Sequence, residues 1–222
     1  GDYYIDSDFG WKAYGLVETS ENNFHKLDED IQNMLIGYAT GYNRYRTDNP
    51  DDISDHCKGK SWVRDINHID LLSYYLGLGL KASGENFVSE VGSAQPPSRL
   101  NQPSAPENTT ERSQPRSLEE ALASIKDPEM GSNGWAIGSE LTEDGGLLLS
   151  NTHFPFWGER RWHESHLTIP GKLDVYGASL IGVAAINIGF NQHLAWTHTV
   201  SINPRFVVYT LDLKEGEPTE YL

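Results

Sequence analysis

The sequence changes character at Met130-Gly-Ser-Asn-Gly-Trp135. Before this stretch, apolar side chains recur at helical spacing, whereas after it the segments have the composition of strands. Helices followed by strands predict an α+β protein. We expect three parts: a mainly helical portion over 1–91, a linker over 92–131 and a strand-rich portion over 132–222.

The helical portion is predicted from local signals. One apolar face runs from Asp28 to Tyr45, with apolar residues three and four positions apart. The run Asp48-Asn-Pro-Asp-Asp52 is predicted to end this helix. A second helix is expected after Asn67 or Asp65, because either side chain can cap a first turn.

The linker is predicted from its composition. Residues 92–117 hold five prolines and few aliphatic side chains. Such a segment buries too little apolar surface to offset the entropy of ordering it. We interpret it as a disordered, protease-accessible linker. Removal of this segment would explain why it lies between two ordered parts of the chain.

Strand-forming segments follow one another in the last part of the chain. Asp144-Gly145 predicts a hairpin turn before the apolar run from Leu147 to Leu149, and Asn191-Gln192 predicts another turn. Further strands are expected at Leu173 to Val175, Ala184 to Phe190, Leu194 to Val200 and Phe206 to Leu213.

The charge of the chain excludes two classes of partner. The 222 residues include 17 basic and 32 acidic side chains, which gives a net charge of −15. Phosphate backbones and anionic membrane surfaces repel such a chain, so we expect neither nucleic acid nor membrane as a partner. No apolar run is long enough to span a bilayer. Gly1 and Leu222 are interpreted as cuts in a longer chain.

No metal site is expected. Cys57 is the only cysteine, which rules out an intrachain disulfide and a site made of several cysteines. The run His163-Glu-Ser-His166 is one residue short of the H-E-x-x-H zinc motif. We expect this run to be extended, which points the two histidines to opposite faces.

Gly131-Ser132 has the chemistry for self-cleavage. Gly131 lacks a Cβ, so its carbonyl can adopt conformations closed to other residues, and the Ser132 hydroxyl could attack it. Scission would make Ser132 an N-terminus, whose α-amine has a pKa of roughly 7.7–8.0. That amine can accept the proton of its own hydroxyl, so neither a separate histidine nor a cofactor is needed. By itself, however, a Gly-Ser pair is a weak signal, because most such pairs form turns, and the alternative is a loop that enters the first strand.

Several blocks resemble the penicillin acylase family of N-terminal-nucleophile hydrolases, with the pattern closest to the N-acyl-homoserine lactone acylases and the aculeacin-type lipopeptide acylases. The residues from Gly37 to Tyr45 and from Cys57 to Val63 resemble the family's α chain. The blocks that resemble its β chain, in the family's order, are Ser132-Asn-Gly-Trp-Ala-Ile-Gly138, Leu147-Leu-Leu-Ser-Asn-Thr-His153, His166-Leu-Thr-Ile-Pro-Gly-Lys-Leu-Asp-Val175, Gly177-Ala-Ser-Leu180, Asn187-Ile-Gly-Phe-Asn191 and Leu194-Ala-Trp-Thr-His-Thr-Val200.

This resemblance implies an αββα sandwich in which Ser132 begins an inner strand. It also implies that the linker ending at Gly131 is a spacer excised during maturation. The product would be a periplasmic or secreted heterodimer of α and β chains cut from one precursor.

The resemblance also assigns the site residues. Ser132 matches the nucleophile, and Val200 matches the residue whose backbone N–H forms part of the oxyanion hole. His153 matches a histidine that orients the nucleophile, although a structural histidine is the alternative. The family's second oxyanion donor, an Asn side chain, would follow Leu222. Substrate-binding roles are expected for Phe154, Leu180 and Asn187.

The leading hypothesis is therefore a self-processing acylase that uses an acyl-Ser132 intermediate. Its small-molecule substrate would be an acyl amide such as an N-acyl-homoserine lactone, a penicillin or a lipopeptide. The alternative is a truncated or inactive homologue that serves as a binding or structural module. A third reading, an exposed adhesion domain, rests only on the acidic charge and the Pro/Ser-rich linker.

Overall fold

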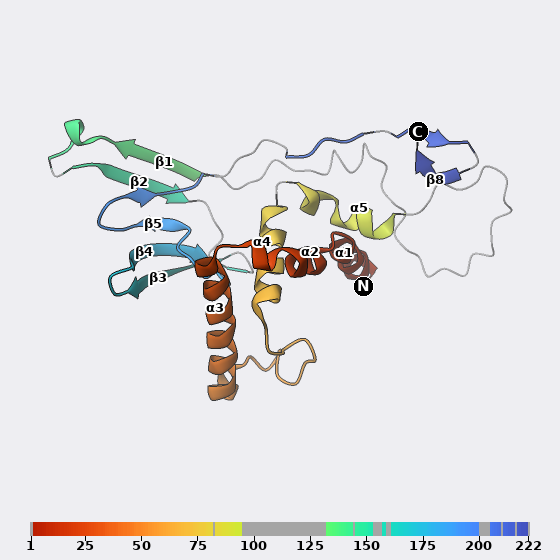
Figure 1. Ribbon diagram of the computed structural model, residues 1–222, viewed down its shortest axis with the longest axis horizontal. Helices are drawn as coiled ribbons and strands as arrows, with labels where there is room; N and C mark the ends of the chain where they lie inside the picture. Colours follow the sequence, from red (N-terminus) through yellow and green to blue (C-terminus); the bar gives the residue numbers. More distant parts are fainter. Residues whose placement is uncertain are drawn as a thin grey trace. The chain divides into compact units, whose positions relative to one another are not determined.

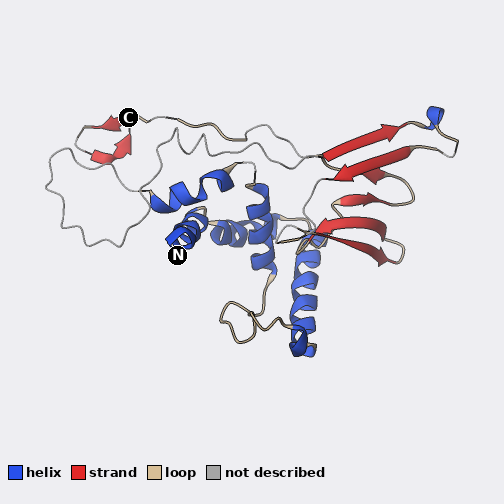
Figure 2. Cartoon of the chain, turned by 180° about the vertical axis from the view of Figure 1, so that it is seen from behind, coloured by secondary structure: helices blue, strands red, loops and turns tan. Residues whose placement is uncertain are grey.

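The computed structural model describes residues 2–81, 83–94, 132–143, 145–152, 157–158, 161–199, 205–209, 211–215 and 217–221. In the described residues, the helices lie between residues 2 and 93, apart from a short 3-10 helix at 139–141, and the strands lie between residues 132 and 221 (Figure 2). The predicted mixture of helices and strands in this order is therefore confirmed. None of the helices in the described ranges is both long and apolar enough to cross a membrane.

The elements are labelled in Figure 1. The helices are α1 (Asp2–Ala13), α2 (Leu16–Asn23), α3 (Glu29–Asp48), α4 (His68–Gly79) and α5 (Val88–Ser93), with the 3-10 helices η1 (Phe24–Lys26), η2 (Pro50–Asp52), η3 (Gly84–Phe87) and η4 (Ser139–Leu141). The strands are β1 (Ser132–Ile137), β2 (Leu147–Thr152), β3 (Trp162–Ile169), β4 (Leu173–Leu180), β5 (Ile188–Phe190), β6 (Ala195–Trp196), β7 (Leu213–Lys214) and β8 (Glu217–Tyr221).

The described residues form two compact units. The first combines the described parts of 2–22, 76–94 and 205–221, and the second combines 23–75 with the described parts of 132–199. The second unit thus joins residues from both sides of the predicted spacer, and it contains Ser132. Of the predicted spacer over 92–131, Gly92 and Ser93 form the end of α5, whereas residues 95–131 lie outside the described residues, so the three-part division stays a prediction.

Helix α3 covers the predicted apolar face and ends within the predicted break. The Asp28 carbonyl oxygen accepts the N–H of Gln32 at 3.0 Å, and the helix ends at Asp48, before Asn49 and Pro50. Its buried face centres on Leu35, which is fully buried, and on Ala39. The side chains that pack with these two residues are Leu71 and the partly buried Phe24, Leu27, Tyr38, Ile66, Leu72 and Tyr75.

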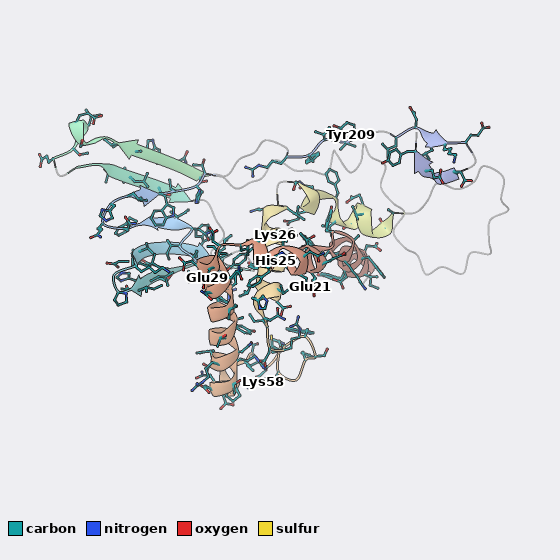
Figure 3. The ribbon with its side chains drawn as sticks, viewed as in Figure 1. Glu21, His25, Lys26, Glu29, Lys58 and Tyr209 are labelled. Carbon is teal, nitrogen blue, oxygen red and sulfur yellow. The ribbon has the colours of Figure 1, made fainter. Side chains whose placement is uncertain are left out.

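The loop between α3 and α4 is exposed and acidic. Lys58, labelled in Figure 3, lies in this loop and pairs with Asp55 at 3.3 Å. Asn43 fixes the end of the loop to α3, because its side-chain amide donates to the Ile66 carbonyl at 2.8 Å and accepts the Ile66 N–H at 2.9 Å. This pairing brings the start of α4 beside α3.

Helix α4 begins with reciprocal capping hydrogen bonds. Asn67 Oδ1 accepts the N–H groups of Ile69 at 2.8 Å and Asp70 at 3.0 Å, while Asp70 Oδ2 accepts the Asn67 N–H at 2.9 Å. Of the two predicted caps, Asn67 is therefore the one used. The Arg64 guanidinium hydrogen-bonds both carboxylate oxygens of Asp70, at 2.6 and 3.0 Å, and holds the pKa of that carboxyl below its ordinary value.

Removing the Asp70 charge is expected to weaken α4. The Asp70→Asn variant should lose about 1 kcal/mol of unfolding free energy at pH 7. Because the folded pKa is depressed, the contribution of Asp70 is present above about pH 4 and is lost as the pH falls through the folded pKa. The difference in unfolding free energy between the variant and the unaltered protein, measured by urea titration, should therefore narrow as the pH is lowered from 7 towards 3. In Asp55→Asn, a carboxyl that is 93% exposed, no such loss is expected.

The strands form three antiparallel sheets, two of which lie in the second unit. Strands β1 and β2 form a two-stranded ribbon, and β3-β4-β5-β6 form a four-stranded sheet in chain order. Strands β7 and β8 form a separate pair in the first unit. The predicted turn at Asn191 is confirmed, because its Oδ1 accepts the N–H groups of His193 and Leu194 at 2.8 and 2.9 Å.

Three strand predictions need correction. The segment from Leu194 to Val200 is a strand only over β6 among its described residues, 194–199, because it pairs with β5 only at Ala195 and Trp196. The segment from Ala184 to Phe190 is a strand only over β5, because the Ala184 N–H donates to the Tyr75 hydroxyl at 2.7 Å instead of to a strand. The segment from Phe206 to Leu213 is a strand only at Leu213 among its described residues. Phe206 packs edge-on against Phe87 at 4.8 Å between ring centroids. High strand propensity does not form a strand without a neighbouring strand to pair with.

Candidate functional site

Ser132 is the first residue of β1. Its backbone pairs with Thr152 at the end of β2, and the pairing continues through Gly134 with Ser150 to Ile137 with Leu147. Ser132 is partly buried. The predicted strand start at Ser132 and the hairpin that follows it are therefore confirmed.

Four of the predicted site residues lie outside the described residues: Gly131, His153, Phe154 and Val200. In the sequence, His153 directly follows Thr152, the register partner of Ser132. The roles assigned to these four residues stay predictions.

Leu180 and Asn187, predicted to bind substrate, do lie together. The Leu180 N–H donates to Asn187 Oδ1 at 3.1 Å, and the Asn187 N–H donates to the Ala178 carbonyl at 3.0 Å. Buried Ser179 directly precedes Leu180 in the sequence, and its hydroxyl donates to the Ala185 carbonyl. These bonds close the connection from β4 to β5 and give Asn187 a structural task. Substrate binding by Leu180 and Asn187 stays a prediction.

Helix α4 contacts the sheet through two adjacent tyrosines. The Tyr74 hydroxyl donates to the Ile181 carbonyl at 3.0 Å, and the Tyr75 hydroxyl accepts the Ala184 N–H at 2.7 Å. Burial raises the pKa of Tyr75 above its ordinary value, although the Ala184 N–H acts in the opposite direction. These contacts join residues that precede the predicted spacer to residues that follow it.

The Tyr75 hydroxyl is expected to stabilise this junction. In Tyr75→Phe the ring stays, but the Ala184 N–H loses its partner in a partly buried place, so the unfolding free energy should fall by about 1.5 kcal/mol. Urea titration measures the loss. The matched control is Tyr45→Phe, which removes an exposed hydroxyl bonded to Asp52 and should cost less than about 0.5 kcal/mol. An equal loss in both variants would contradict this role.

The two histidines of the run His163-Glu-Ser-His166 lie on β3, in the expected extended conformation. His163 pairs with Ser179 and His166 pairs with Tyr176, so the two imidazoles project to opposite faces. His166 Nε2 lies 2.6 Å from Asp174 Oδ1. Within the part of the chain that the structure describes, no three His, Cys, Asp or Glu side chains are grouped to hold a metal ion.

The sequence predicts no role for Ser150 and Thr197, but their side chains are in contact beside β1. Their hydroxyl oxygens are 2.7 Å apart, and the Thr197 methyl lies close to Gly134. Both residues belong to blocks quoted above, but hydroxyl side chains are common in turns and strand ends. Nothing in the spacing predicts that these two residues meet.

Known proteins resemble the chain over most of its length. An acyl-homoserine lactone acylase PvdQ from Pseudomonas fluorescens (strain Pf0-1) is 41% identical over 195 residues, which cover 87% of this chain and 24% of that protein. Aculeacin-A acylase from Actinoplanes utahensis is 36% identical over 212 residues, which cover 94% of this chain and 26% of that enzyme. The chain thus spans about a quarter of the length of these relatives.

The family model for penicillin amidase matches residues 1–222. This match spans both the helical residues and the strands that begin at Ser132, as the resemblance of the separate blocks predicted. The chain belongs to the penicillin amidase family.

Proposed function

We propose that the protein is a self-processing acylase that hydrolyses an acyl amide through Ser132. The observation that carries this proposal is the position of Ser132 at the start of β1 in a chain of the penicillin amidase family. The names of the relatives, an acyl-homoserine lactone acylase and an aculeacin-A acylase, support the same class of reaction. The alternative, an inactive homologue that serves as a binding or structural module, predicts no turnover.

Processing would begin when the Ser132 hydroxyl attacks the Gly131 carbonyl carbon. The peptide C–N bond breaks, the acyl group moves to the serine oxygen, and the nitrogen becomes the α-amine of Ser132. Water then hydrolyses the ester and leaves a carboxylate on Gly131 and a free hydroxyl on Ser132. Every bond that breaks is replaced, and water is the only co-reactant.

Turnover would use the same two groups on an external amide. The α-amine accepts the Ser132 hydroxyl proton as the oxygen attacks the acyl carbon, and it returns that proton to the leaving nitrogen. The Val200 N–H would stabilise the oxyanion, and such a donor is worth about 3–4 kcal/mol when correctly aimed. His153 would orient Ser132 or its amine. Water hydrolyses the acyl-Ser132 ester, so the reaction requires no cofactor.

The proposal extends to the architecture of the mature protein. We propose an αββα sandwich formed by two chains that stay associated after the spacer leaves. The contacts of Tyr74 and Tyr75 with residues 181–184, and the ion pair of Lys172 with Asp30 at 2.5 Å, support such an association. A periplasmic or secreted location belongs to the same proposal.

A panel of acyl amides tests the proposed activity. The protein expressed from its complete reading frame is incubated with N-acyl-homoserine lactones of graded chain length, a penicillin and an acylated lipopeptide. Release of the free amine from at least one class is the expected result, with Phe154, Leu180 and Asn187 contributing to the choice of acyl chain. No release from any class by a fully cleaved protein would favour the inactive homologue.

A further inference from the structure

One threonine contacts both strands of the hairpin that carries Ser132. Thr197 directly follows β6, and its hydroxyl oxygen lies 2.7 Å from that of Ser150 on β2. Its methyl group lies against β1, where a Cβ added to Gly134 would stand 3.0 Å from Thr197 Cγ2. Thr197 therefore fixes the end of the four-stranded sheet to the hairpin by a hydrogen bond and by a close packing contact.

The register shows which face of the hairpin Thr197 covers. Gly134 pairs with Ser150, and Ser132 stands two residues before Gly134 on the same strand. Side chains two residues apart on a strand project to the same face. A Cβ on Gly134 would point towards Thr197. The Ser132 side chain therefore projects from the same face of the hairpin on which Thr197 packs.

Thr197 also stands three residues before Val200 in the sequence. We propose that Thr197 is a positioning residue, which acts through Ser150 and Gly134 to set the nucleophile strand against the segment that leads to the oxyanion donor. This inference rests on the proposed function, because it gives Ser132 and Val200 their roles. Thr197 itself does not touch the reacting atoms in this proposal.

Two substitutions of Thr197 separate its hydroxyl from its shape. Thr197→Val keeps the volume and loses the bond to Ser150, whereas Thr197→Ser keeps the hydroxyl and loses the methyl group. In the protein expressed from its complete reading frame, Thr197→Val should slow both chain cleavage and kcat about fivefold, the factor that corresponds to one ordinary hydrogen bond. KM should stay within about twofold, because a positioning effect is realised in the transition state. Thr197→Ser should retain near-normal rates.

A compensating pair tests the packing contact. Gly134→Ala places a methyl group against Thr197 Cγ2. Among the described residues beyond the chain neighbours of Gly134, the other atom within 4 Å of that Cβ position is the Leu149 carbonyl oxygen, at an ordinary 3.8 Å. Gly134→Ala alone should slow cleavage about fivefold, because the collision displaces the hydroxyl from Ser150. Gly134→Ala with Thr197→Ser removes the collision and restores the bond, so its rates should return to within about twofold of the unaltered protein.

The controls separate positioning from folding and from the proposed function. Thr168→Val, an exposed threonine on β3, should change neither rate. Provided that the unaltered protein cleaves itself and hydrolyses an acyl amide, either of two results would overturn the positioning role. One is normal rates in Thr197→Val, and the other is a double variant that is as slow as Gly134→Ala. A fall in melting temperature and yield with unchanged kcat would assign Thr197 a purely structural role. An unaltered protein that never yields a chain beginning at Ser132 would overturn the proposed function and this inference together.

Discussion

The Ser132→Ala variant should remain one unbroken chain and should lose acyl-amide turnover by at least about ten-thousandfold. Alanine keeps the strand start of β1 but has no oxygen to attack Gly131, so neither the new α-amine nor the acyl-enzyme can form. Intact mass after expression measures the cleavage, and release of free amine from an acyl amide measures the turnover.

The matched control for this variant is Ser139→Ala. Ser139 is an exposed serine in η4, within the connection between β1 and β2. Its removal should leave both cleavage and turnover unchanged. A Ser132→Ala protein that is still cut after Gly131, or that still releases amine at the normal rate, would show that another group does the chemistry.

The second large effect is expected at a pair of glycines. Gly177 on β4 pairs with Gly189 on β5, and a Cβ on Gly177 would overlap the Ile188 carbonyl oxygen and crowd the Gly189 Cα at 2.6 Å. Both obstacles are backbone atoms, which no rotamer change can move aside. Gly177→Ala should therefore force β4 and β5 apart and cost about 3 kcal/mol of unfolding free energy, measured by urea titration.

The matched control for Gly177→Ala is the same substitution at Gly41. Gly41 lies in the interior of α3, and beyond its chain neighbours and the helix's own backbone, an added Cβ would meet no atom of the described residues within 4 Å. Gly41→Ala should raise the unfolding free energy by up to about 1 kcal/mol, because alanine is the better helix former. The change in unfolding free energy is expected to be a loss for Gly177→Ala and a gain for Gly41→Ala. A comparable loss in both variants would contradict the close approach of β4 and β5.

The sequence predicts the helices of the second unit well because their signals are local. Helix α3 ends at Asp48, before Asn49 and Pro50, and the start of α4 depends on Asn67. Of the apolar side chains at helical spacing on α3, Leu35 is buried, whereas Ile31, Tyr42 and Tyr45 are exposed. Capping and helical spacing act within a few residues, so a single sequence is enough to read them.

The strands are predicted less well because their partners are distant in the sequence. Residues 206–209 have high strand propensity, but among the described residues no strand pairs with them. The sequence predicts an extended backbone only for the run from His163 to His166. The observed strand β3 is longer, and its pairing with β4 runs from Trp162 to Ile169. Tertiary contacts decide both outcomes.

For the candidate site, the family resemblance predicts the position of Ser132 at a strand start, but not the hydrogen bond from the Leu180 N–H to Asn187 Oδ1. It does not predict the contacts of Thr197 with Ser150 and Gly134, which are 47 and 63 residues away along the chain. Such contacts depend on how the hairpin meets the four-stranded sheet. Neither the sequence spacing of Ser150 and Thr197 nor their strand propensity predicts how the hairpin contacts the sheet.

The most direct measurement is the N-terminal residue of the mature protein's strand-bearing chain, determined by intact mass and sequencing after expression from the complete reading frame. A chain that begins with the serine at position 132, accompanied by a separate helical chain, is the predicted result. A polypeptide that stays continuous across the bond between residues 131 and 132 and nevertheless hydrolyses acyl amides would contradict catalysis by a serine with its own α-amine as the base.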